Sequence, residues 1–150
     1  MNKAILMGVL ALGVSCSYRM GRALPTDPAL TAGYIHAASS LQGAEQLVSS
    51  AFVRELSRRS GGGEEQSVSL ELLYLEDRPT ASNSRLSRIR MAIALTSSET
   101  GRIEVTGVRV YSGSEEAVEN AIRRDHALSS LTTELVQEGL PQLSMTQQDN

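Results

Sequence analysis

Two segments in the middle of the chain alternate between apolar and polar residues, and this pattern constrains the fold more than any other feature. Every second residue is apolar in both: Val68, Leu70, Leu72 and Tyr74 in the first, Ile89, Met91, Ile93 and Leu95 in the second. A period of two is typical of a β-strand with one buried face. The sequence therefore predicts strands over 67–74 and 88–95 that share a core, joined by a polar loop over 77–84.

A third strand is predicted over 103–110, after a hairpin turn over 97–101. Its apolar residues change phase along the strand: Ile103 and Val105 lie on one face, Val108 and Val110 on the other. Gly107 stands at the change of phase. A β-bulge at Gly107 would bring all four apolar side chains back to the same face.

A weaker strand is predicted over 30–37, and a helix follows it from Gln42 and Gly43. The helix has apolar residues at helical spacing: Ala44, Leu47, Val48, Ala51, Phe52 and Leu56. This spacing produces an amphipathic helix with one apolar stripe. Three consecutive glycines, at 61–63, are expected to end it.

The last predicted element is a long helix that begins at Ser114, or at Ser112 with Glu115 as a capping box. Its apolar positions form one seam: Ala117, Ala121, Leu128, Leu131 and Leu135, widened by Val118, Ile122 and Val136. Gly139 and Pro141 are expected to stop it.

These elements follow in the order β-α-β-β-β-α. Consecutive strands joined by short turns pair antiparallel, and the apolar stripes of the helices need a sheet face to cover. The predicted fold class is therefore α+β, with two helices packed on one face of a mainly antiparallel four-stranded sheet. We expect residues 30–143 to form this single domain and residues 144–150 to form a polar tail.

The N-terminal residues are typical of a bacterial export signal. Lys3 precedes an apolar run over 4–12, which is far shorter than the roughly 20 residues that span a membrane. Small residues then lead into Cys16, the only cysteine in the chain, as in the lipobox of bacterial lipoproteins. We expect a signal peptide over 1–15, a lipid attached covalently to Cys16, and an extended tether over 16–29. The alternative is a soluble secreted protein with an ordinary cleavage site.

Composition argues against several functional classes. A net charge of −3, five aromatic residues and no tryptophan disfavour a nucleic-acid-binding module. The two histidines and single cysteine form no metal-ligand spacing, so neither a metal nor another cofactor is expected besides the lipid on Cys16. Asp125 and His126 are neighbours on a helix and lack a nucleophile motif. We therefore expect no catalytic residue, and no enzymatic activity.

Arginines cluster near the second alternating strand. Arg88 and Arg90 are expected on one sheet face, with Arg85 in the loop before them. Arg102 on the next strand would add to this face, and Glu104 would partly neutralise it. Guanidinium groups bind phosphates with paired hydrogen bonds. The patch is thus either a candidate site for lipid phosphates or an ordinary solvated sheet face.

Several short motifs resemble the outer-membrane lipopolysaccharide-assembly lipoproteins of the LptE family. The N-terminal match covers residues 16–20 and a downstream Leu24 and Pro25. The predicted element order is also that of the family. The C-terminal match comprises Tyr111, Glu119, Asn120, Arg123, Arg124, Ala127, Leu128, Leu131, Leu135 and Val136.

The resemblance implies an outer-membrane lipoprotein on the periplasmic side. Such a protein would fill the lumen of the β-barrel LptD, assist the assembly of that barrel and help to insert lipopolysaccharide at the cell surface. It would also imply that Arg85, Arg88 and Arg90 contact lipopolysaccharide phosphates. Two other functions stay open at this point: an adaptor lipoprotein of another envelope complex, and a small secreted hydrolase.

Overall fold

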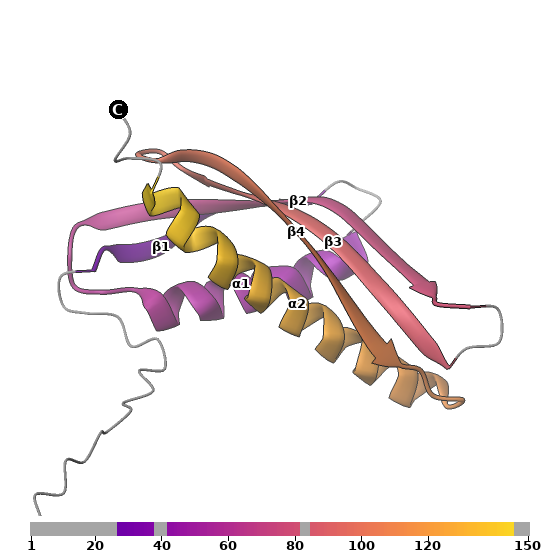
Figure 1. Ribbon diagram of the computed structural model, residues 1–150. Helices are drawn as coiled ribbons and strands as arrows, with labels where there is room; N and C mark the ends of the chain where they lie inside the picture. The colour runs from indigo at the N-terminus through magenta and orange to yellow at the C-terminus, as the bar shows by residue number, and fades with distance from the viewer. Residues whose placement is uncertain (1–26, 38–41, 82–84, 146–150) are drawn as a thin grey trace, which may run out of the picture.

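The computed structural model describes residues 27–37, 42–81 and 85–145. The elements are β1 (Ala29–Ala37), α1 (Gln42–Arg59), β2 (Glu65–Pro79), β3 (Leu86–Ser97), β4 (Gly101–Ser112) and α2 (Ala117–Met145). This order, β-α-β-β-β-α, confirms the predicted fold class (Figure 1). The expected signal peptide, Cys16, most of the tether and the last five residues lie outside the described residues.

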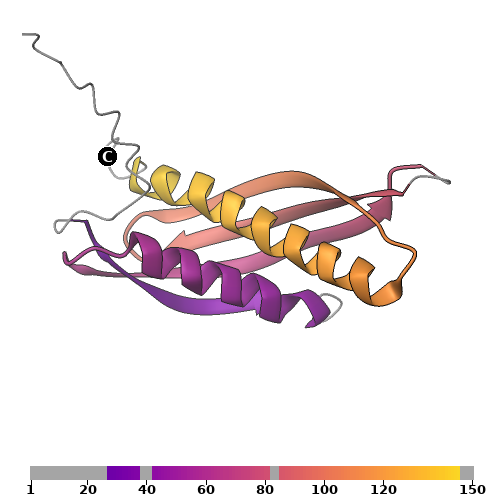
Figure 2. The ribbon, with the colours of Figure 1, turned by 90° about the horizontal axis from the view of Figure 1, so that it is seen from below.

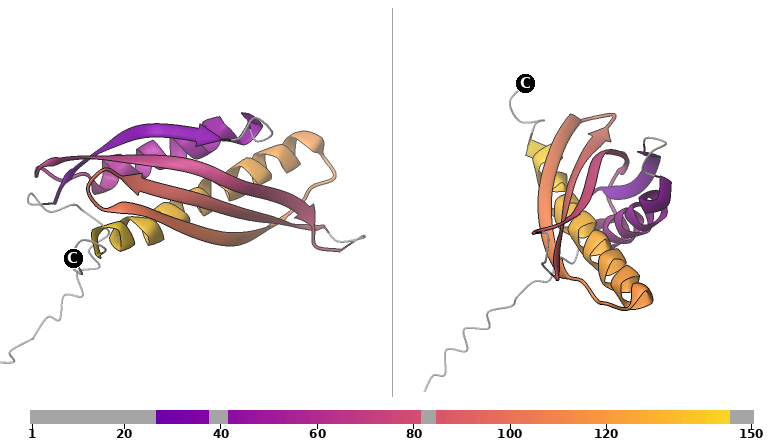
Figure 3. Two further views of the ribbon diagram at one scale, coloured as in Figure 1. Left: turned by 90° about the horizontal axis from the view of Figure 1, so that it is seen from above. Right: turned by 90° about the vertical axis from the view of Figure 1, so that its right-hand side faces the viewer.

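The sheet has the order β1-β2-β3-β4, which places β1 and β4 at its edges. β1 runs parallel to β2, while β2, β3 and β4 pair antiparallel. Both helices lie on the same side of the sheet, with α1 beneath β1 and β2 and α2 running obliquely across β3 and β4 (Figure 2). The other side of the sheet has no helix over it (Figure 3, left).

The core fills the space between the helices and the covered sheet face. In β3 the alternating residues Ile89, Met91, Ile93 and Leu95 are each at most 1% exposed, as the period of two predicts. The predicted stripe of α1 is buried in the same core except for Leu47, which is partly buried. Burial of this apolar surface is the main favourable term that holds the layers together.

The β-bulge forms in β2, and the prediction of a bulge at Gly107 is wrong. The pairing of β3 with β4 continues without interruption from Leu86 with Ser112 to Ser97 with Gly101. The pairing of β2 with β3 instead shifts between Leu72 and Tyr74.

These two registers decide which apolar residues point away from the core. Beyond its bulge, β2 turns Tyr74 to the uncovered face, where it is 45% exposed, although the sequence pattern had placed it with the core residues. Because β4 has no bulge, Val108 and Val110 stay on the uncovered face as well.

The loop after β2 is shorter than the predicted 77–84, because β2 continues to Pro79. Asp77 faces the helices in this extension. Its carboxylate accepts hydrogen bonds from the Tyr111 hydroxyl at 3.2 Å and from Arg124 Nε at 2.8 Å. A polar residue that looked typical of a loop is therefore held inside a strand by a partner on β4 and another on α2.

Helix α2 does not stop at Gly139 and Pro141, as predicted, but continues to Met145. A Cβ atom at Gly139 would lie 2.7 Å from Leu95 Cδ1 and 3.0 Å from Val105 Cγ2. Glycine is therefore needed here because α2 lies so close to the sheet. Leu143, which follows Pro141, is 3% exposed, and its burial favours another helical turn despite the proline.

The start of α2 lies beyond the core. Ser114 is the residue that helps to start the helix: its Oγ accepts a hydrogen bond from the Glu116 N–H at 3.3 Å. Val118 and Ile122 are 75% and 64% exposed, so they do not widen the buried seam as predicted. The buried part of α2 begins at Ala127.

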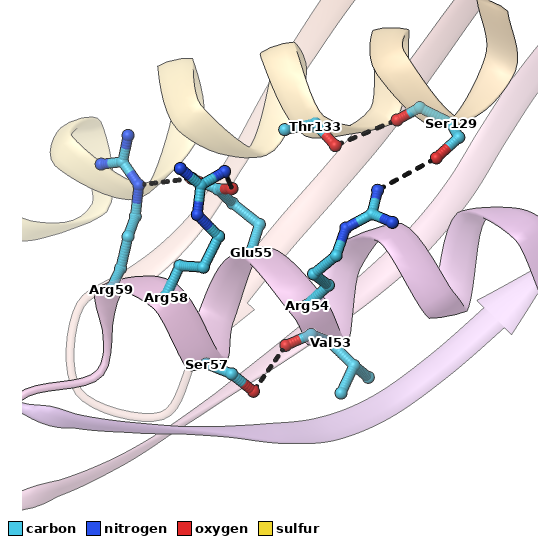
Figure 4. A network of polar contacts seen from close by, with 8 residues as sticks. All are labelled: Val53, Arg54, Glu55, Ser57, Arg58, Arg59, Ser129 and Thr133. Carbon is cyan, nitrogen blue, oxygen red and sulfur yellow. Dashed lines mark hydrogen bonds and ion pairs between the residues drawn. The ribbon is translucent and has the colours of Figure 1, made fainter. Parts of the chain in front are cut away.

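Polar contacts along α1 complete the helical layer (Figure 4). Arg54 donates a hydrogen bond to Ser129 Oγ on α2 at 3.1 Å. Glu55 is only 3% exposed, and its carboxylate accepts from Arg59 Nε at 2.9 Å and from Arg58 at 3.4 Å. Pairing with two guanidinium groups offsets part of the cost of burying this carboxylate.

Candidate functional site

The uncovered sheet face carries the three arginines that were predicted on β3 and β4. Arg88 and Arg90 are exposed and project from β3, as predicted from the alternation. Arg102 projects from β4 on the same face. The arginines are nevertheless divided between the two ends of the face.

At one end, Arg88 and Arg90 stand beside apolar side chains. The register pairs Arg88 with Val110 and Arg90 with Val108 on β4. The two valines are 51% and 54% exposed. Among the residues that the structure describes, no carboxylate lies within ion-pair distance of either arginine. We call Arg88, Arg90, Val108 and Val110 the arginine–valine patch.

On the β2 side of this patch lies one carboxylate, that of Glu76, and it already has an ion-pair partner. Arg78 Nε lies 2.6 Å from Glu76 Oε1. The Tyr74 hydroxyl also donates to Glu76, and this hydrogen bond, together with Arg78, Arg90 and Arg88, holds the pKa of Glu76 below its usual range. The same hydrogen bond is the main reason that the pKa of Tyr74 is raised. Three guanidinium groups face one carboxylate here, so positive charge is in excess.

At the other end of the face, Arg102 is enclosed by acidic groups. It lies 2.9 Å from Glu71 on β2 and 3.1 Å from Glu104 on its own strand. We call Arg102, Glu71 and Glu104 the acidic clamp. Arg102 pairs in register with Thr96 rather than with a residue near Arg88. The prediction that Arg102 shares this face and is partly neutralised by Glu104 is confirmed, but Arg102 lies at the end away from Arg88 and Arg90.

Arg85 directly precedes β3, which begins at Leu86. Its guanidinium is 2.6 Å from the Glu115 carboxylate, which precedes α2. Both side chains are more than 80% exposed. Exposed pairs of this kind are weak, so Arg85 can exchange Glu115 for another anion at little cost.

Four further residues of this face were not predicted to lie on it: Val108, Val110, Glu76 and Tyr74. A signal for the valines was present in the sequence, since a turn that pairs Ser97 with Gly101 also fixes every later pair of the hairpin. Counting back from that turn sets Val108 opposite Arg90. The bulge in β2, which brings Tyr74 and Glu76 to this face, had no comparable signal.

Cys16 lies outside the described residues. Asp125 lies 3.8 Å from Arg124, with which it forms an ion pair. In the described ranges, no group of three or more His, Cys, Asp or Glu side chains could hold a metal ion. None of the helices described is both long enough and apolar enough to cross a membrane.

Solved structures with TM-scores above 0.5 share the fold of this chain. One is a protein of Caulobacter crescentus assigned as a lipoprotein, with a TM-score of 0.56 and 10% identity over 79% of this chain and 88% of that one. Another is a Xanthomonas campestris protein of the DUF330 family, with a TM-score of 0.54 and 18% identity over 85% and 94% of the two chains.

A weaker match is rare lipoprotein B from Shewanella oneidensis, with a TM-score of 0.46 and 10% identity over 77% of this chain and 96% of that one. No protein-family model and no curated protein matches the sequence. The chain thus has the α+β fold of a protein assigned as a lipoprotein, at identities that establish the fold alone.

Proposed function

We propose that this protein is a lipid-anchored, non-enzymatic assembly factor of the outer membrane. In this proposal it is attached through Cys16, docks with an LptD-type β-barrel and assists the delivery of lipopolysaccharide to the cell surface. The proposal joins the lipobox-like sequence at Cys16 and the resemblance to the LptE family with the chemistry of the uncovered sheet face.

The observation that carries the proposal is the arginine–valine patch. Lipopolysaccharide has phosphate groups next to acyl chains, so a site for it needs cationic and apolar groups side by side. Arg88 and Arg90 have no ion-pair partner among the described residues, and each stands beside an exposed valine. Guanidinium groups bind phosphate through parallel hydrogen bonds, and the valines offer apolar contact to the adjoining chains.

A second consideration is how such a domain would fit within a barrel. The lumen of an outer-membrane barrel is polar and lined by water. The uncovered face carries serine, threonine, arginine and glutamate along with its few apolar residues. A face of this kind can lie in a polar lumen without exposing a large apolar area to water.

The partner is tested by purifying the protein, with its natural signal sequence and a C-terminal affinity tag, from envelope membranes. We expect an LptD-type barrel to co-purify in about equal amounts. Its absence from the purified material would contradict the proposed function. A barrel-free complex with other envelope proteins would favour the adaptor alternative.

The anchor is tested separately by labelling with radioactive palmitate. The wild-type protein should incorporate the label and fractionate with the outer membrane, whereas Cys16→Ser should do neither. Serine keeps the size of the side chain but lacks the thiol that is acylated. Equal labelling of both proteins would rule out Cys16 as the attachment site.

A further inference from the structure

The edge strand β4 has main-chain groups available for pairing. In an edge strand, alternate residues direct their N–H and C=O groups away from the sheet. β4 pairs with β3 on one side, and no described strand lies on the other. Its second half, from Thr106 to Ser112, carries only Thr, Val, Val and Ser on the uncovered face.

The opposite edge of the sheet is less suited to pairing. The register of β1 shifts between Ala32 and Ile35, where the Tyr34 N–H donates to a side chain of β2, Ser69 Oγ, at 3.0 Å. An irregular edge of this kind discourages the addition of another strand. β4 has no register shift, proline or lysine along its whole length. Of the two edges, β4 is therefore the one fitted for strand addition.

A groove runs beside this part of β4, on the side of α2. It has a volume of about 450 Å³ and is lined by residues 109–112 of β4 and by Ile122, Arg123, His126 and Ala127 of α2. Ile122 is 64% exposed, although it is a large apolar residue. Arg123 donates to the Ser112 carbonyl oxygen at 3.3 Å, so this side chain already occupies the last acceptor of the strand.

The charge of the groove indicates what could enter it. Its lining contains Arg109, Arg123 and His126 but no carboxylate. Arg109 and Arg123 form ion pairs with Glu134 and Glu119, which lie outside the lining. An acidic side chain on an incoming strand would therefore meet no carboxylate in the lining, and arginines that each have one carboxylate partner where Arg102 has two.

We propose that the second half of β4 binds an extended segment of the barrel partner as a fifth strand of the sheet. The main chain of that segment would pair with the β4 edge. Alternate side chains of the segment would lie beside Val108 and Val110 on one face, and against Ile122 in the groove on the other. An acidic side chain at a groove-facing position would meet Arg109 and Arg123. This inference rests on the proposed function, because it names the surface that the barrel engages.

Hydrogen exchange of the full-length lipidated protein tests the inference, with the protein measured alone and in its complex with the barrel. Backbone amides in 106–111 should exchange roughly tenfold or more slowly in the complex, because outward-facing N–H groups gain partners. Amides of β1 should exchange equally in both samples.

Substitutions in the groove provide an independent readout. Ile122→Glu removes the apolar contact and places a carboxylate where the acidic side chain of the incoming strand would lie, so it should weaken barrel binding by roughly tenfold, as expected at the centre of an interface. The matched control is Val53→Glu on α1, where the wild-type residue is 41% exposed and the helix packs against β1 and α2. The control should bind like the wild type.

The outcomes separate this inference from the proposed function. If the complex forms while exchange over 106–111 is unchanged and Ile122→Glu binds normally, strand addition at β4 is excluded and the proposed function stands. If no barrel binds, both are excluded. Protection of β4 without the barrel, rising with protein concentration, would identify a second copy of this chain as the occupant and would equally overturn the inference.

Discussion

Arg90 and Arg102 project from the same uncovered face, but their neighbours give them different chemistry. Arg102 lies within 2.9 Å of Glu71 and 3.1 Å of Glu104, so its charge is balanced by two carboxylates. Arg90 stands opposite Val108 and beside Glu76, which Arg78 already binds. The comparison shows that strand register, rather than residue type, decides which guanidinium group is available to an anion.

The largest effect is expected when Arg90 is given the carboxylate neighbour that it lacks. Val108→Glu places an acid directly opposite Arg90, as Glu71 and Glu104 are placed around Arg102. We expect lipopolysaccharide binding to fall by roughly tenfold, because the new carboxylate neutralises Arg90 and repels phosphate. Binding can be measured with the purified protein and a fluorescent lipopolysaccharide. The isosteric amide Val108→Gln should retain most of the affinity, and equal losses in both variants would contradict the electrostatic explanation.

The converse change removes the acidic clamp. In the double variant Glu71→Gln, Glu104→Gln, Arg102 loses both ion-pair partners while the shape of the site is kept. Lipopolysaccharide affinity should rise about two- to fivefold, in line with the small energies of exposed ion pairs. The same binding titration measures it. Unchanged affinity would mean that position on the face, and not charge balance, keeps Arg102 from binding.

Arg102→Gln should change the stability of the fold but not lipopolysaccharide binding. Loss of two half-exposed ion pairs should lower the free energy of unfolding by less than about 1 kcal/mol. Urea denaturation measures this change. Lipopolysaccharide binding should be the same as in the wild type, and a clear loss of binding would show that both ends of the face take part.

The smallest expected effect concerns the pH dependence at Glu76. Its pKa is lowered mainly by the hydrogen bond from Tyr74 and then by the neighbouring arginines. A lowered pKa stabilises the folded state above the unfolded pKa, about 4.3 for glutamate, and this contribution is lost as the pH falls through the folded value. Stability should therefore decline slightly more below pH 4 in the wild type than in Tyr74→Phe, as measured by thermal unfolding. An NMR titration that shows the same Glu76 pKa in both proteins would contradict this explanation.

Much of the fold could be predicted because alternation and helical spacing are local signals. The alternating residues of β3, the stripe of α1 and the turn at 97–101 lie where the sequence places them. Local signals did not predict the features of the fold that depend on tertiary contacts. Gly139 looks like a helix stop, yet it is the residue that lets α2 approach Leu95 and Val105. The bulge beyond Leu72 depends on how two strands pair, which one strand's sequence does not reveal.

The candidate site was predictable only in part, for a related reason. Arg88 and Arg90 could be assigned to one face from the alternation in β3. Their neighbours come from other strands, so the valines beside them and the distant position of Arg102 follow only from the register. The ion pair between Arg85 and Glu115 joins two loops, and no sequence pattern indicated it.

The most direct test of the central claim compares lipopolysaccharide binding by two sets of arginine variants. One carries Arg85→Gln, Arg88→Gln and Arg90→Gln together, and the other carries Arg102→Gln alone. All four positions are exposed, so both proteins should fold. We predict that the triple variant loses at least about tenfold in affinity, as expected for several charge-assisted hydrogen bonds, and that Arg102→Gln binds normally. Unchanged binding by the triple variant would contradict the assignment of these arginines to lipopolysaccharide phosphates.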